Sequence, residues 1–107
     1  MTTVPITELA AVIRSKNAGP YELTLDILFK DGRDYLRLKE INFFTRRLFA
    51  EIYGIPESKI IALVYFDAAF AVKCTIVRPI VSGAPGDTDI YGAQQHAPLL
   101  NLRVPAA

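Results

Sequence analysis

The chain has 107 residues and nearly balanced charge, with 12 Lys and Arg against 11 Asp and Glu. This length predicts a single domain over residues 1–107. A net charge of +1 provides no strong positive field, so neither nucleic acid nor an anionic membrane surface is expected as a partner. Hydrophobic residues make up 51%, which indicates either that a partner covers apolar surface or that a sheet is buried on both faces.

The cysteine content and the hydropathy pattern predict a cytoplasmic protein. Cys74 is the chain's one cysteine, so no disulfide forms within the chain, and its apolar surroundings predict a small buried thiol. No apolar run reaches the roughly 20 residues that cross a bilayer, and the first residues do not resemble a signal peptide.

The first predicted element is a helix over residues 5–16. Pro5 suits a first helical turn, and apolar residues recur at helical spacing at Ile6, Leu9, Ala10 and Ile13. The stretch 17–20 contains Gly and Pro and ends this helix.

A strand follows over residues 21–29, because polar and apolar residues alternate there. Its predicted buried face holds the apolar residues Tyr21, Leu23, Leu25, Ile27 and Phe29. The opposite face holds the polar residues Glu22, Thr24 and Asp26. This pattern is typical of a sheet that is covered on one side.

Two helices and a hairpin come next. Residues 34–41 are predicted helical, and a second helix begins at Asn42 or Thr45 and runs to Tyr53. Residues 60–66 carry no charge, which favours a central strand covered on both faces. After a turn at residues 67–69, the predicted elements are strands over 70–77 and 99–104.

This order of elements predicts an α+β fold. The expected architecture is a small mixed β-sheet with helices packed on one face, similar to a ferredoxin-like split βαβ, together with a long loop near the C-terminus. The helix-free face, which carries Lys73 and Thr75 beside the polar residues of strand 21–29, is expected to meet solvent, a partner or the long loop.

The long loop, residues 82–98, is the predicted functional loop, because long irregular segments are usually functional or disordered. Its polar residues are Asp87, Asp89, Tyr91, Gln94, Gln95 and His96. His96 has a pKa suited to acid–base catalysis, and Asp87 or Asp89 would orient it, so these three are the candidate catalytic residues. The alternatives are a structural histidine, or a metal site formed by the same three residues. No metal is assigned, because their spacing matches no standard metal-binding motif, and the sequence identifies no cofactor.

A second polar cluster contains Arg14, Lys16 and Asn17, at the predicted end of the first helix. It is either a helix C-cap with solvated charges or a turn that binds a carboxylate or phosphate. Together with Tyr91, Gln94 and Gln95, these residues form the candidate substrate-binding set.

Two segments carry a family resemblance. Residues 12–27 read VIRSKNAGPYELTLDI, and residues 79–98 contain GDTDIYGAQQHAP. They resemble the domain-of-unknown-function family numbered 4387, small bacterial proteins that occur beside, or fused to, AtuA-like (acyclic terpene utilisation) proteins. The turn after Arg14-Ser15 is also similar to the Arg-Ser-Gly-Asp-Lys-Gly-Asp turn of the ferredoxin-like C-terminal AtuA-like domain, although this chain lacks its aspartates.

The resemblance implies an accessory subunit of an AtuA-like enzyme in carboxylic-acid or acyl-CoA breakdown. The partner is then a large AtuA-like subunit, and loop 82–98 contributes to a shared site. Two alternatives remain open. One is a stand-alone homo-oligomeric lyase or hydratase that uses His96 as general acid or base, and the other is a small-molecule-binding or regulatory module.

Overall fold

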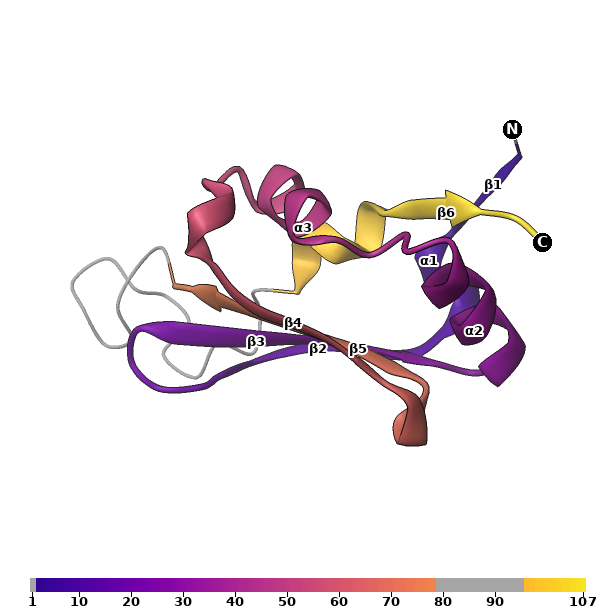
Figure 1. Ribbon diagram of the computed structural model, residues 1–107, viewed down its shortest axis with the longest axis horizontal. Helices are drawn as coiled ribbons and strands as arrows, with labels where there is room; N and C mark the ends of the chain where they lie inside the picture. The colour runs from indigo at the N-terminus through magenta and orange to yellow at the C-terminus, as the bar shows by residue number, and fades with distance from the viewer. Residues whose placement is uncertain (1, 79–95) are drawn as a thin grey trace.

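A four-stranded antiparallel sheet in the order β2-β3-β5-β4 is the framework of the molecule (Figure 1). The computed structural model describes residues 2–78 and 96–107. The strands of this sheet are β2 (Ala10–Asn17), β3 (Glu22–Phe29), β4 (Ile60–Phe66) and β5 (Ala71–Val77). Two hairpins, β2–β3 and β4–β5, therefore meet along the β3–β5 pair.

Helices α2 (Gly32–Glu40) and α3 (Arg46–Tyr53) both lie on one face of this sheet (Figure 1). The predicted alternation on β3 explains this arrangement, because Leu23, Leu25 and Ile27 are fully buried on that face. They form the core with apolar side chains from the helices and the C-terminal segment, among them Leu38, Phe44, Phe49 and Leu99. We call the helix-covered face the inner face and the opposite one the outer face.

The predicted α+β class and split βαβ unit are confirmed. Strands β3 and β4 run parallel, with β5 inserted between them and antiparallel to both. The connection from β3 to β4 passes through α2 and α3. The sheet itself is antiparallel and not mixed as predicted, because each hydrogen-bonded pair of strands in it is antiparallel.

Local capping defines the bounds of both longer helices. The Asp31 side chain accepts a hydrogen bond from the Arg33 amide at 2.9 Å, so α2 begins at Gly32, two residues before its predicted start. Thr45 caps α3 by accepting a hydrogen bond from the Leu48 amide at 3.0 Å. Of the two predicted starts, Asn42 and Thr45, the second is therefore correct. Gly54 ends α3 with φ 64°.

The predicted helix over residues 5–16 is wrong. Helix α1 spans only Ile6–Leu9, and the chain continues as β2. Residues 12 and 13 are β-branched and therefore suit a strand. In addition, β3 pairs with residues 10–17 and supplies backbone hydrogen bonds that stabilise them as a strand. Arg14 and Lys16 therefore lie along a strand and not in a last helical turn.

The prediction of a central strand over residues 60–66 is also wrong in its position. The strand forms as β4, but it is an edge of the sheet. Three of its apolar side chains, those of Ile61, Val64 and Phe66, are between 41% and 48% exposed. An uncharged run is typical of buried strands, but the composition of one strand does not determine how many neighbours it has.

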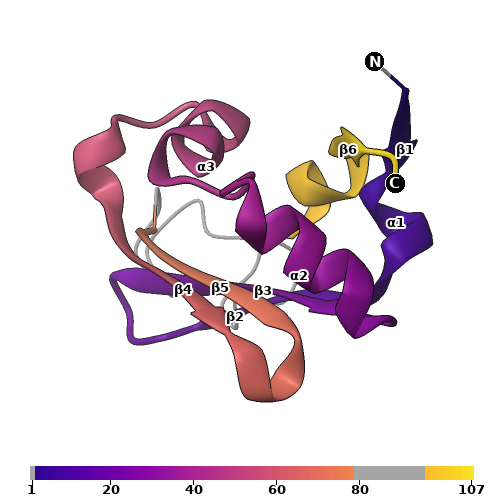
Figure 2. The ribbon, with the colours of Figure 1, turned by 45° about the vertical axis from the view of Figure 1, so that its right-hand side comes forward.

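The two ends of the chain form a second, two-stranded sheet from β1 (Thr3–Pro5) and β6 (Arg103–Pro105) (Figure 2). The predicted strand over 99–104 is thus mostly incorrect, since a 3-10 helix, η3 (Ala97–Asn101), precedes the short β6. Leu99 and Val104 are fully buried, so η3 and β6 close the core beside the helices. Among the described residues, no helix is long and apolar enough to span a membrane.

Candidate functional site

A row of charged side chains crosses the middle of the outer face. Asp26 on β3 lies directly opposite Arg14 on β2 and directly opposite Lys73 on β5. Residues that oppose each other across antiparallel strands share a face, so the three side chains are neighbours. We call Arg14, Asp26 and Lys73 the charged row.

The carboxylate of Asp26 is the most unusual group in this row. Its side chain is fully buried, and its Oδ2 accepts a hydrogen bond from Arg14 Nε at 2.9 Å. Its Oδ1 is buried and has no hydrogen-bond partner within the part of the chain that the structure describes. Buried polar atoms nearly always have partners, so Oδ1 is an acceptor that needs a donor.

Further polar groups extend this site along the outer face. Lys16 is exposed and opposes Thr24, whose hydroxyl lies 3.5 Å from that of Thr75. The Lys73 ammonium lies 5.3 Å from the centre of the Phe66 ring. Three cations, Arg14, Lys16 and Lys73, thus share the outer face with one carboxylate, which Arg14 contacts directly. The arrangement is suited to an anion that also donates a hydrogen bond.

The predicted substrate-binding residues on β2 divide between the two faces. Arg14 and Lys16 lie two residues apart in the strand and share the outer face. Asn17 opposes the buried Leu23 and lies on the inner side, where its Oδ1 accepts from Arg78 Nη1 at 3.0 Å. The predicted capping turn is incorrect in this respect, because these residues belong to a strand.

His96 is the one predicted catalytic residue that the structure describes. It is half-buried at the start of η3, and its carbonyl accepts from the Leu99 amide at 2.9 Å. The other predicted loop residues lie outside the described residues, namely Asp87, Asp89, Tyr91, Gln94 and Gln95. The catalytic and binding roles of loop 82–98 therefore stay predictions.

Sequence reasoning placed Asp26 and Lys73 on the outer face but did not assign them to a site. The sequence feature that could have indicated the site is Asp26 itself, an acidic residue in the middle of a strand that is otherwise well buried. Arg78 was missed as well. It is only 4% exposed, its amide donates to the Tyr21 carbonyl at 2.8 Å, and its side chain holds Asn17. A lone arginine directly after a strand gives no pattern from which this burial can be predicted.

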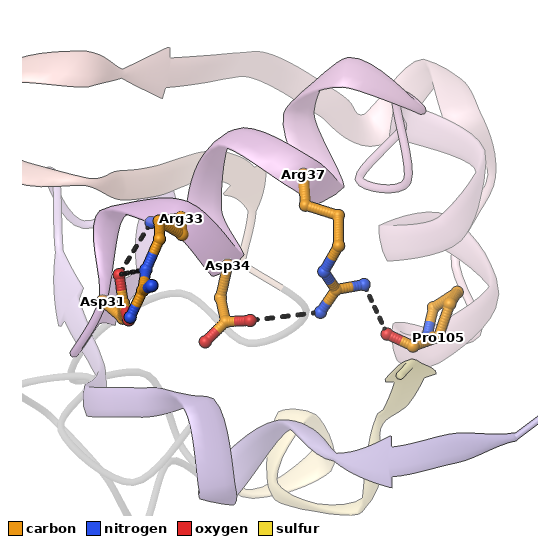
Figure 3. Close-up of polar contacts among 5 residues, drawn as sticks. All are labelled: Asp31, Arg33, Asp34, Arg37 and Pro105. Atoms are coloured by element: carbon orange, nitrogen blue, oxygen red, sulfur yellow. Dashed lines mark hydrogen bonds and ion pairs between the residues drawn. The ribbon is translucent and has the colours of Figure 1, made fainter. Parts of the chain in front are cut away.

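Another polar cluster, formed by Asp31, Arg33, Asp34 and Arg37, lies at the start of α2 and along it (Figure 3). These residues line a surface hollow of about 380 Å³. Its arginines already have partners within the chain. Arg33 bonds Asp31 at 2.9 Å, while Arg37 bonds Asp34 at 3.3 Å and the Pro105 carbonyl at 2.7 Å. Arg37 therefore joins α2 to the C-terminal segment, and Arg33 is paired locally with Asp31. The outer face is the better candidate site.

A third polar cluster joins α2 to the tip of the β4–β5 hairpin. The buried Tyr35 hydroxyl donates to Asp67 Oδ1 at 2.6 Å, and Lys39 Nζ lies 2.8 Å from the same atom. Burial, and then the bond to Asp67, raise the pKa of Tyr35 well above its usual value. The hydrogen bonds from Lys39 and then Tyr35 lower the pKa of Asp67. Tyr35 is therefore a neutral donor that anchors the hairpin.

Cys74 is fully buried, as predicted, and burial raises the pKa of its thiol to about 12. A thiol with so high a pKa is a poor nucleophile. Within residues 2–78 and 96–107, no three His, Cys, Asp or Glu side chains gather as a metal-binding group. The outer face thus remains the candidate site in this part of the chain.

The sequence matches one known family over most of its length. The model of a family described as Domain of unknown function (DUF4387) matches residues 6–103. The chain belongs to this family. The span matched by DUF4387 includes all four strands of the main sheet and every residue of the charged row. No curated protein and no solved structure matches the chain.

Proposed function

We propose that this chain is the accessory subunit of an AtuA-like enzyme that acts in carboxylic-acid or acyl-CoA breakdown. The resemblance of residues 12–27 and 79–98 to proteins found beside AtuA-like chains supports this proposal. In it, the small subunit contributes the outer face, with the charged row, and loop 82–98 to a site shared with the larger subunit.

The observation that carries the binding role of this face is the buried Oδ1 of Asp26, which has no hydrogen-bond partner among the described residues. Holding a buried carboxylate oxygen without a donor costs free energy, of order 1–3 kcal/mol. A substrate hydroxyl or N–H group that displaced the groups covering Asp26 and donated to Oδ1 would recover this cost. Arg14 keeps the other oxygen bonded at 2.9 Å and thereby fixes the direction in which Oδ1 accepts.

The cations beside Asp26 support a substrate that carries a carboxylate. The Arg14 side chain is half exposed, so its guanidinium retains N–H groups beyond the Nε that bonds Asp26. Lys16 and Lys73 add two ammonium groups to the same face. A carboxylic acid with a hydroxyl or N–H donor fits both halves of this site.

The apolar surface around the site supports a larger protein partner. Val12, Val64 and Phe66 lie on the outer face and are 40%, 48% and 45% exposed. Apolar side chains that surround a charged centre are typical of a surface that another protein covers. A large subunit seated there would also exclude water and strengthen the interactions of Asp26 with substrate.

The partnership is tested by co-expressing this chain with an AtuA-like large chain encoded beside it. We expect the two chains to co-purify through size exclusion, and Val12→Glu, which places a charge on the outer face, to weaken the complex. Glu57→Ala is the matched control, because Glu57 is exposed in the 3-10 turn η1 (Glu57–Lys59), next to α3 and away from the outer face. A wild-type small chain that elutes separately from the co-expressed large chain contradicts the partnership.

The binding role of Asp26 is tested separately by titrating the co-purified complex with lactate, malate and coenzyme A. We expect Asp26→Asn to weaken binding of a hydroxy acid at least tenfold while the complex stays intact. Asp34→Asn makes the same change of carboxylate to amide on α2 and should bind like the wild type. Equal binding by Asp26→Asn and wild type would remove Asp26 from the site.

A further inference from the structure

Strand β4 is an exposed edge without a charged residue. Its sequence from Ile60 to Phe66 is Ile-Ile-Ala-Leu-Val-Tyr-Phe, rich in the β-branched and aromatic residues that favour strands. Natural edge strands are usually protected by charged side chains, Pro, bulges or a covering segment. Among the described residues, protection is confined to the first end of β4. A bulge lies between Ile60 and Ala62, and the Arg46 guanidinium donates to the carbonyls of Ile60 and Ile61.

Beyond that point the free edge has no protection within the described residues. From Ala62 to Phe66 the backbone pairs with β5 on one side, and β4 is the last strand of the sheet on the other. Its apolar side chains at Val64 and Phe66 are 48% and 45% exposed. A row of unpaired backbone N–H and carbonyl groups is a template on which another extended strand can pair.

A second copy of the same strand fits this template best. Two copies of β4 related by a two-fold axis run antiparallel, and they bring no charges together because neither carries one. Pairing β4 with the opposite edge, β2, would instead place Arg14 and Lys16 against apolar residues and would propagate as an open filament. We propose that this chain forms a two-fold dimer by antiparallel pairing of β4, through residues 62–66.

The dimer would contain one continuous eight-stranded sheet, with the helices of both copies on the inner face. Val64 of one copy would oppose Val64 of the second copy on the outer face, and Phe66 of each copy would oppose Ala62 of the other. Five strand spacings of about 4.8 Å separate the two copies of β3, so the two Asp26 side chains would lie roughly 24 Å apart. Each charged row stays uncovered by this interface, and the inference does not rest on the proposed function.

The test is the mass of the purified full chain by light scattering or sedimentation at micromolar concentration. We expect a dimer for the wild type and a monomer for Val64→Lys, which places a like charge on both sides of the axis. Val12→Lys is the matched control on the opposite edge, since Val12 is also on the outer face and 40% exposed. We expect this variant to remain a dimer.

Two further measurements keep the outcome unambiguous. Circular dichroism and thermal melting must show that Val64→Lys is folded, and Val64→Thr, which keeps the β-branched shape without a charge, should remain a dimer. A monomeric wild type, or a dimer that survives Val64→Lys, overturns the proposal. Equal loss of the dimer in Val12→Lys and Val64→Lys also overturns it. None of these outcomes alters the Asp26 titration, so failures of the two proposals are distinguishable.

Discussion

Hydrogen bonds from across the fold lower the pKa of one carboxyl group in this chain, whereas burial is the main cause of the raised pKa values of Tyr35 and Cys74. The carboxyl group is that of Asp67 at the hairpin tip, because Lys39 and Tyr35 on α2 both donate to it. Its pKa is lowered in the folded protein, so the resulting stabilisation is present above the unfolded pKa and is lost as the pH falls through the folded pKa. The relevant window is therefore below about pH 4.

We expect Lys39→Met to raise the pKa of Asp67 toward its ordinary value, because the Lys39 hydrogen bond is the largest cause of the lowering. Tyr35→Phe removes the second cause and should raise this pKa by less. A carboxyl-carbon NMR titration of Asp67 in the three proteins measures the effect. An Asp67 pKa that is unchanged in Lys39→Met would contradict this account.

The free-energy cost of truncating a leucine depends on whether its strand lies in the middle of the sheet or at its edge. Leu25 on β3 is 1% exposed between two neighbouring strands, whereas Leu63 on β4 is only partly buried at the edge. The loss on truncating an apolar side chain grows with the contacts removed and the cavity left behind. A loss of about 2–5 kcal/mol, typical of a fully buried leucine, is therefore expected on β3, and a smaller loss on β4.

We expect Leu25→Ala to lower the free energy of unfolding by about 2–5 kcal/mol and Leu63→Ala by about 1–2 kcal/mol. Urea unfolding of both variants measures the two values. Each measurement is made at one protein concentration, since any association would stabilise the folded chain. Equal losses at the two positions would mean that another segment covers β4.

Across the whole molecule, the ends of the chain are joined to each other and to α2. The Ala106 amide donates to the Thr2 carbonyl at 3.0 Å, next to the β1–β6 pair. Arg37 connects this pair to α2, because its guanidinium donates to the Pro105 carbonyl (Figure 3). Arg33, one turn earlier, is 90% exposed and bonds only its local neighbour Asp31 among the described residues.

We expect Arg37→Ala to lower the free energy of unfolding by about 1–2 kcal/mol, since it removes a partly buried charged donor. The Ala106 amide should then exchange its hydrogen faster, because the β1–β6 pair loses its link to α2. Arg33→Ala should leave this exchange rate unchanged. Similar exchange in both variants would show that the ends are held by β-pairing alone.

The sequence by itself determined the features that depend on neighbours along the chain. These are the alternation that buries Leu23, Leu25 and Ile27, the helix between Thr45 and Gly54, the hairpin turn at residues 67–69 and the α+β class. Part of the candidate site was also predictable, because Arg14 and Lys16 stand out as cations. Each of these features depends on side-chain periodicity, capping or turn chemistry within a few residues.

Only the tertiary structure decided the features that depend on pairing between distant segments. Residues 10–17 have apolar residues at helical spacing, yet β3 provides a partner that makes them a strand. Residues 60–66 have the composition of a central strand, yet the sheet order places them at its edge. The charged row exists because the β2–β3 and β3–β5 registers align residues 12 and 47 positions from Asp26. Strand register is a property of two segments at once, so one segment's sequence does not contain it.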